Sequence, residues 1–129
     1  MSEFIETPKV TAHHTVEGEV MACSRVYLGR NIPTASDGRN AVVRESGIDR
    51  FIHEVVAPLF PKGFTITHAQ GGWQDQVTGE ALREPSLVVE VVHPPADTEE
   101  VEALARSWKR WFDQDSVLIT AHPVLARFV

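Results

Sequence analysis

The chain contains one cysteine, Cys23, among its 129 residues. A single cysteine cannot form a disulfide within the chain, and it cannot build a zinc site from several thiolates. Basic charge is also scarce, because 12 lysines and arginines stand against 18 aspartates and glutamates, for a formal net charge of -6. No basic patch interleaved with aromatic residues is present, so we do not expect nucleic acid as a partner.

Long apolar runs are missing as well. No run approaches the roughly 18–20 residues that a membrane-spanning helix needs. The opening segment MSEFIETPKV carries acids where a secretory signal has basic residues, and no apolar segment follows it. We therefore expect no membrane contact and a cytoplasmic location. Neither a glycine-rich phosphate-binding loop nor a serine nucleophile flanked by glycines is found.

The remaining composition is that of an ordinary globular protein, with 43% hydrophobic and 23% charged residues. A chain of this length fits one domain. Residues 1–22 show no firm period, and we interpret them as an N-terminal arm with one short strand at residues 16–21. Residues 23–129 then form the single domain.

The periodicity of apolar residues predicts the elements of this domain. Alternation predicts strands at residues 23–29, 64–68, 86–93 and 116–121. Helical spacing predicts helices over residues 45–59 and from residue 97 or 98 to about residue 112. Loops are predicted at residues 30–40 and in a hairpin connection that starts at Trp73 and turns near Thr78 and Gly79. The tail after Pro123 is expected to add one more edge segment.

The order strand, helix, strand, strand, helix, strand indicates an α+β, ferredoxin-like βαββαβ domain with a four-stranded antiparallel sheet. Both helices are expected on one face, over the apolar set Val26, Leu28, Phe64, Ile66, Leu87, Val89, Val91, Val117 and Ile119. The opposite face is predicted to hold Arg25, Tyr27, Thr65, Thr67, Val88, Glu90, Val92, Leu118 and Thr120, with His122 at its end.

That second face would be a large exposed patch if it stayed bare. We therefore expect two copies to pair sheet to sheet as a dimeric α+β barrel, or to form a higher homo-oligomer, and to enclose a cavity. The expectation of a site in this cavity rests on analogy with the fold.

Glu90 is the most informative residue of the predicted face, because it is an acid between Val88 and Val92. Loss of water around its carboxylate would suit a general base. The alternative is an ion pair with Arg25, which would keep Glu90 ionised. Tyr27 is either a proton donor to substrate or an amphipathic interface aromatic.

The histidines have competing interpretations. His93 ends a strand before two prolines, where a histidine often bonds a turn carbonyl. His68 and His93 are expected at opposite ends of antiparallel strands, so we predict no metal site. A single histidine, His122 or His68, is the alternative acid or base. Trp73 is expected to form a lid, to stack on a ring, or to seal the core.

Four stretches carry a family resemblance: SRVYLGRNIP, FIHEVVAPLFPKGFTITHAQGGWQD, REPSLVVEVVHP and KRWFDQDSVL. They resemble an uncharacterised bacterial family, the domain of unknown function number 3574, over residues 24–129. The resemblance supports the domain limits and the fold and implies no activity. It marks Arg25, Tyr27, Trp73 and Glu84 as motif positions, and Glu84 is expected to pair with Arg83 or a partner loop, or to act in catalysis.

Together these patterns predict a small-molecule enzyme, a lyase or isomerase that transfers protons without a cofactor. The predicted catalytic residues are Glu90, Tyr27, Arg25 and His122. The predicted substrate contacts are Trp73, His68, Glu84 and Thr67. The alternative is a non-catalytic module for ligand binding or dimerisation, with the same face filled by side chains.

Overall fold

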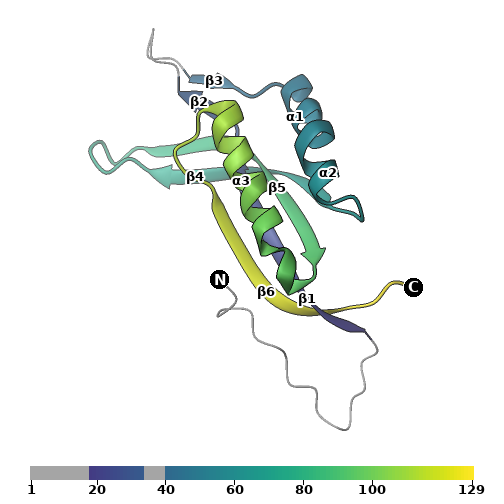
Figure 1. Cartoon of the computed structure of the whole chain (residues 1–129). Helices are drawn as coiled ribbons and strands as arrows, with labels where there is room; N and C mark the ends of the chain where they lie inside the picture. The colour runs from purple at the N-terminus through teal and green to yellow at the C-terminus, as the bar shows by residue number, and fades with distance from the viewer. Residues whose placement is uncertain (1–17, 34–39) are drawn as a thin grey trace.

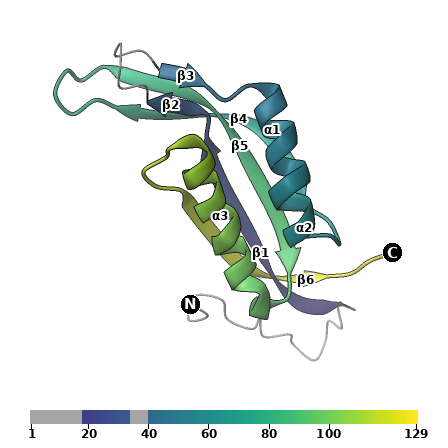
Figure 2. The same cartoon turned by 45° about the horizontal axis from the view of Figure 1, so that its top comes forward.

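Four long strands form one antiparallel sheet in the order β4-β5-β1-β6, in a computed structural model that describes residues 18–33 and 40–129. The strands are β1 (Glu19–Gly29), β4 (Thr65–Gln74), β5 (Ala81–His93) and β6 (Leu118–Ala126). The helices lie together on one face of this sheet (Figures 1 and 2). The α+β, ferredoxin-like arrangement predicted from the sequence is therefore confirmed.

The first helix covers residues 45–59, as predicted, in three continuous pieces: α1 (Glu45–Phe51), η1 (Ile52–Val56) and α2 (Ala57–Leu59). The backbone is right-handed helical at both joints. The middle piece has the wide turns of a π-helix. Pro58 has no N–H to donate to the carbonyl of Glu54, and the wide turns end just before it. The helix buries Ile48, Phe51 and Val56.

The second helix, α3 (Thr98–Phe112), follows the short turn η2 (Pro95–Asp97). Acids occupy its first turn and Lys109 and Arg110 its last, which complements the helix dipole. It buries Val101, Leu104, Ala105 and Trp108, whereas Phe112, the fifth apolar residue at this helical spacing, packs half-buried against the core. The indole of Trp108 packs edge-on against Phe51, with ring centroids 5.0 Å apart, and donates a hydrogen bond to the carbonyl of Gly29.

The core lies between these helices and the sheet. The predicted helix-side residues of the two central strands are all buried: Val26, Leu28, Leu87, Val89 and Val91. The predicted residues from the other segments pack against them half-buried: Phe64, Ile66, Val117 and Ile119. The alternation of apolar residues thus predicted the correct face for each strand.

The strands are longer than the sequence pattern predicted. β1 begins at Glu19, β4 runs through Trp73 to Gln74, and β5 begins at Ala81. The stretch from Ala69 to Gly72 is small and polar, so it carries no alternation, yet the ladder with β5 continues through it. The expected connection therefore shrinks to a tight turn, which does sit at Thr78 and Gly79.

Two further corrections concern shorter segments. The predicted edge segment after Pro123 is part of β6 itself. The loop expected at residues 30–40 contains β2 (Asn31–Pro33), which pairs with β3 (Asn40–Val42).

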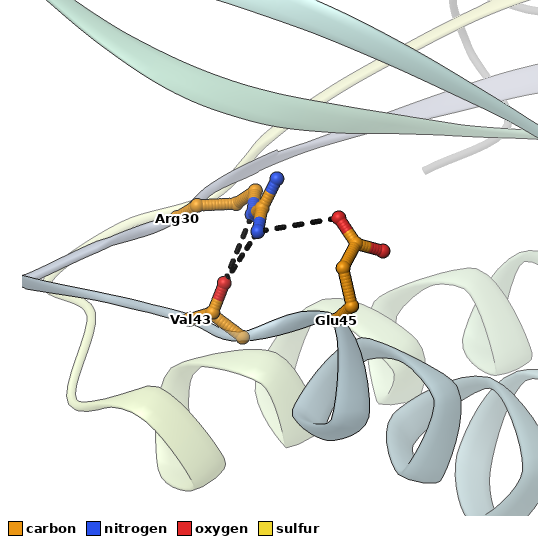
Figure 3. Close-up of polar contacts among 3 residues, drawn as sticks. All are labelled: Arg30, Val43 and Glu45. Carbon is orange, nitrogen blue, oxygen red and sulfur yellow. Dashed lines mark hydrogen bonds and ion pairs between the residues drawn. The ribbon is translucent and has the colours of Figure 1, made fainter.

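Arg30 ties this small hairpin to the first helix (Figure 3). Its Nη2 donates to the carbonyl oxygen of Val43 at 2.6 Å and lies 3.5 Å from Oε1 of Glu45. The end of β1 is thereby fixed to the start of α1.

Residues 1–17, most of the expected arm and the first part of its strand at residues 16–21, lie outside the described residues. The proposed boundary between arm and domain stays a prediction. Within residues 18–33 and 40–129, no helix combines the length and the apolar character required to cross a bilayer.

Candidate functional site

The sheet face opposite the helices, called the open face here, carries a shallow concavity of about 320 Å³. Its lining is Arg25, Tyr27, Thr65, Thr67, Val88 and Glu90. The strand register explains this grouping, because it aligns the residues in two rows across three strands. Glu90 lies between Arg25 and Thr65, and Val88 lies between Tyr27 and Thr67. Four predicted site residues, Arg25, Tyr27, Thr67 and Glu90, are therefore brought together.

Arg25 and Glu90 form the ion pair that was the alternative interpretation of Glu90. The Nε of Arg25 donates to Oε2 of Glu90 at 2.7 Å. This hydrogen bond, followed by the negative charge of Glu90, raises the pKa of Arg25. The two side chains are 44% and 36% exposed, so the expected loss of water around Glu90 does not occur within one chain. The open face must be covered before Glu90 is desolvated.

Two other predicted residues share the open face but lie away from the concavity. His122 is exposed on β6, opposite Cys23, so two strand spacings, about 10 Å, separate it from β5. Trp73 is 51% exposed and pairs with Leu82 in the ladder between β4 and β5. It lies eight positions from Thr65, or about 26 Å along the strand. Neither reaches Glu90 within one chain.

His68 lies on the helix side of β4, opposite the buried Leu87, and is exposed. It is six positions from His93 along the paired strands, in agreement with the predicted separation. Across residues 18–33 and 40–129, no group of three His, Cys, Asp or Glu side chains is arranged to hold a metal ion.

Glu84 has a structural contact that the sequence did not predict. Its Oε2 accepts a hydrogen bond from the backbone N–H of Asn31 at 3.1 Å, rather than pairing with Arg83. The carboxylate lies over Gly29, where an added Cβ would be 2.9 Å from Oε1. Glu84 therefore joins the start of β5 to the start of β2, and its carboxylate occupies the space that a side chain at Gly29 would fill.

Cys23 belongs to the open face by its position on β1, but it is only 5% exposed. Burial raises the pKa of its thiol, the charge of Glu90 raises it further, and Arg25 lowers it. The thiol is therefore protonated at neutral pH and is a poor nucleophile.

A buried polar pair on the helix side was missed. The Oγ of Ser24 lies 2.7 Å from Nε2 of His93, and Nδ1 of His93 lies 2.7 Å from the carbonyl oxygen of Pro94. A carbonyl only accepts, so Nδ1 carries the proton and Ser24 donates to Nε2. The predicted contact of His93 with a turn carbonyl is thus present. The contact with Ser24 depends on the register of β1 and β5, which the sequence pattern does not reveal.

A larger cavity, of about 670 Å³, lies at the end of the sheet and is called the end pocket here. It is lined by the first residues of β1, the turn after α2, the end of β5 and the end of β6, with Phe60, Lys62 and His93 among them. Pro61, Lys62 and Gly63 fall between the predicted helix at residues 45–59 and the predicted strand at residues 64–68. Four distant segments meet here, so local periodicity gave no signal of a pocket.

Several solved structures have a fold similar to that of this chain. A phage SAM lyase in complex with S-methyl-5'-thioadenosine is 15% identical with a TM-score of 0.54, over 90% of this chain and 97% of the lyase. The Bacillus subtilis GlnK–ATP complex is 13% identical with a TM-score of 0.53, over 84% of this chain and 85% of GlnK. CutA from Synechococcus elongatus is 12% identical with a TM-score of 0.52, over 85% and 81%. At these identities the likeness concerns the fold alone.

No curated protein matches the sequence. A family profile does match, over residues 24–128. Residues 24–128 include the four stretches that carry the resemblance. They also include every residue that lines the concavity on the open face. The chain therefore belongs to the family described as proteins of unknown function, DUF3574.

Proposed function

We propose that the protein is a lyase or isomerase that acts on a small molecule at the open-face concavity without a cofactor. The observation that supports this proposal best is the convergence of a carboxylate, a guanidinium and a phenol, from Glu90, Arg25 and Tyr27, on a face that the helices leave uncovered. A base and two hydrogen-bond donors for a developing anion are the groups that proton transfer requires.

Glu90 would act as the base. Its Oε2 is engaged by Arg25, whereas Oε1 accepts no hydrogen bond from the described residues and is available to take a proton. As negative charge develops on the substrate, the guanidinium of Arg25 would shift its interaction toward that charge. Tyr27, on the same side of β1, would donate from its hydroxyl, and Thr67 would orient the substrate.

A second copy of the chain would complete this site. The concavity is shallow, and Arg25 and Glu90 remain well exposed in one chain. Covering the open face would exclude water and strengthen the interactions of both charges with a developing anion. We therefore propose a homodimer or higher homo-oligomer, and we expect it in the cytoplasm.

The names of the fold neighbours suggest which substrates to assay first. One neighbour is a SAM lyase with S-methyl-5'-thioadenosine bound, and another is a complex with ATP. These names support testing adenosine compounds first, beginning with S-adenosylmethionine. The test is to incubate purified protein with S-adenosylmethionine and to measure release of S-methyl-5'-thioadenosine by chromatography.

Two variants test the assigned roles once turnover is measured. We expect Glu90→Gln and Tyr27→Phe each to lower kcat by about 100-fold or more while leaving the melting temperature unchanged. Glu54→Gln is the matched control, because it removes a carboxylate whose ion pair, among the described residues, is with Arg50 on the first helix. Wild-type turnover in either open-face variant would contradict the proposal.

The second candidate is a non-catalytic module for ligand binding or dimerisation. The observation in its favour is that Arg25 and Glu90 already satisfy each other at 2.7 Å without any ligand. Arg25→Ala separates the two candidates. A module held together by this face should lose its dimer, measured by sedimentation, whereas an enzyme should keep the dimer and lose turnover.

A further inference from the structure

The end pocket exists because neighbouring strands stop at different positions. β4 begins at Thr65, opposite Glu90, so the last three residues of β5 have no partner on that side. The turn after α2 passes this end of β5 instead. On the other side, residues 19–21 of β1 pair only with β6 and continue past His93. The resulting volume of about 670 Å³ is in the range of small-molecule sites.

The floor of the pocket is apolar and held in place. Val91, His93 and Phe60 line it and are only 2%, 3% and 6% exposed. Both ring nitrogens of His93 are engaged by Ser24 and Pro94, so the imidazole presents no free donor or acceptor to the pocket. The ring of Phe60 lies beside it, with centroids 6.4 Å apart. Such a floor suits a flat apolar group.

Lys62 supplies a cation at the rim. It is exposed on the turn after α2 and makes no ion pair with another described residue. Two acids also line the pocket, Glu19 and Asp97. Asp97 precedes α3, where the helix dipole stabilises its charge. Arg127 adjoins Ala126, the register partner of Glu19, which brings a second cation to that part of the rim.

We propose that the end pocket binds a small molecule with a flat apolar body and a carboxylate. The body would lie against Phe60 and His93, and the carboxylate would contact the ammonium of Lys62. This site is separate from the one under "Proposed function", because the end pocket and the open-face concavity share no lining residue.

Two probes of equal shape test the proposal, 2-naphthoate and 2-naphthamide, titrated into the full chain and followed by backbone amide chemical shifts. We expect naphthoate to bind about fivefold tighter than naphthamide, the size of one favourable ion contact. The shifts should move at Gly63 and Val92 and stay unchanged at Tyr27 and Val88. Lys62→Gln should remove the preference for naphthoate.

The matched control is Lys109→Gln, which removes the same charge from α3 and should keep the preference. Met21→Trp is a second variant, since it fills the pocket and should weaken both probes at least tenfold. Any of the following outcomes would overturn the proposal: no saturable binding at millimolar probe, shifts at Tyr27 and Val88, equal loss of preference in both lysine variants, or no effect of Met21→Trp. Tighter binding of 2-naphthylmethylamine than of naphthoate would also overturn the proposal, because the rim would then prefer a cationic ligand to a carboxylate.

Discussion

At the scale of single residues, Gly29 is a position where the side chain of Glu84 occupies the space of a Cβ. A Cβ there would meet the carboxylate of Glu84 at 2.9–3.0 Å. The carboxylate would have to move away and release the N–H of Asn31. We expect Gly29→Ala to lower the free energy of unfolding by about 1 kcal/mol, measured by urea denaturation.

Gly71 provides the control for this prediction. It pairs with the same Glu84 across β4 and β5, but a Cβ there would lie 3.9 Å from Cγ of Glu84, an ordinary contact. Gly71→Ala should change the free energy of unfolding by less than about 0.5 kcal/mol. Equal effects of the two alanine substitutions would contradict the role assigned to Glu84.

Ser24 is the second residue with a specific expected effect. Ser24→Ala would leave Nε2 of the buried His93 without a partner. Such an unsatisfied group costs about 1–3 kcal/mol, which should appear as a lower midpoint in urea. Ser107→Ala is the matched control, because that hydroxyl bonds within α3, donating to the Ala103 carbonyl and accepting from Nη2 of the exposed Arg110, and its loss should be nearly neutral.

Whether the contacts of a residue could be predicted from the sequence depends on what places its neighbours. Arg25 and Glu90 could be paired from sequence because alternation places both on one face of central strands. Glu84 could not, because its partner Asn31 lies in β2, a strand that the sequence did not predict. Ser24 could not, because its contact with His93 depends on the register between β1 and β5. The degree of exposure of Glu90 was also beyond the sequence, since it depends on whether another copy covers the face.

At the scale of elements, the turn between β4 and β5 is organised by Asp75. Its Oδ1 accepts hydrogen bonds from the backbone N–H groups of Val77 and Thr78 at 2.8 and 2.9 Å. These bonds, led by that of Thr78, lower the pKa of Asp75 from its ordinary value of 3.8. Gly79 completes the turn with a φ of +73°.

A lowered pKa gives this turn a defined dependence on pH. Because the folded pKa lies below 3.8, the stabilisation is complete above that pH and is lost as the pH falls through the folded pKa. We expect the amide shifts of Val77 and Thr78 to change below pH 3.8 and to report a midpoint under that value. Asp75→Asn keeps an acceptor oxygen and should abolish the titration. A midpoint above 3.8 would contradict the assignment.

The elements themselves were predicted better than their ends. Strongly periodic segments gave both helices and all four strands on the correct faces. The ends of β4 and β5 were missed because Ala69, Gly71 and Gly72 follow no pattern and are strand only through pairing. The short pair β2 and β3 was missed because Pro33 and its neighbours are typical of loops.

At the scale of the whole molecule, the open face carries apolar residues that one chain does not cover. Val92 and Leu118 are 41% and 60% exposed on it. If two copies pair through this face, Leu118→Glu should convert the dimer to a monomer in analytical ultracentrifugation. Val77→Glu, at the 95% exposed tip of the hairpin, is the control and should leave the assembly unchanged. A wild-type monomer at all concentrations would contradict the proposed assembly.

The placement of β1 also has a consequence for the order of folding. Both of its sheet neighbours, β5 and β6, come from the other half of the chain, so β1 pairs only after long loops have closed. Within the four-stranded sheet, β4 and β5 alone are joined by a tight turn, which makes them the local pair. We therefore expect the β4–β5 hairpin to form early and the insertion of β1 between β5 and β6 to limit the folding rate.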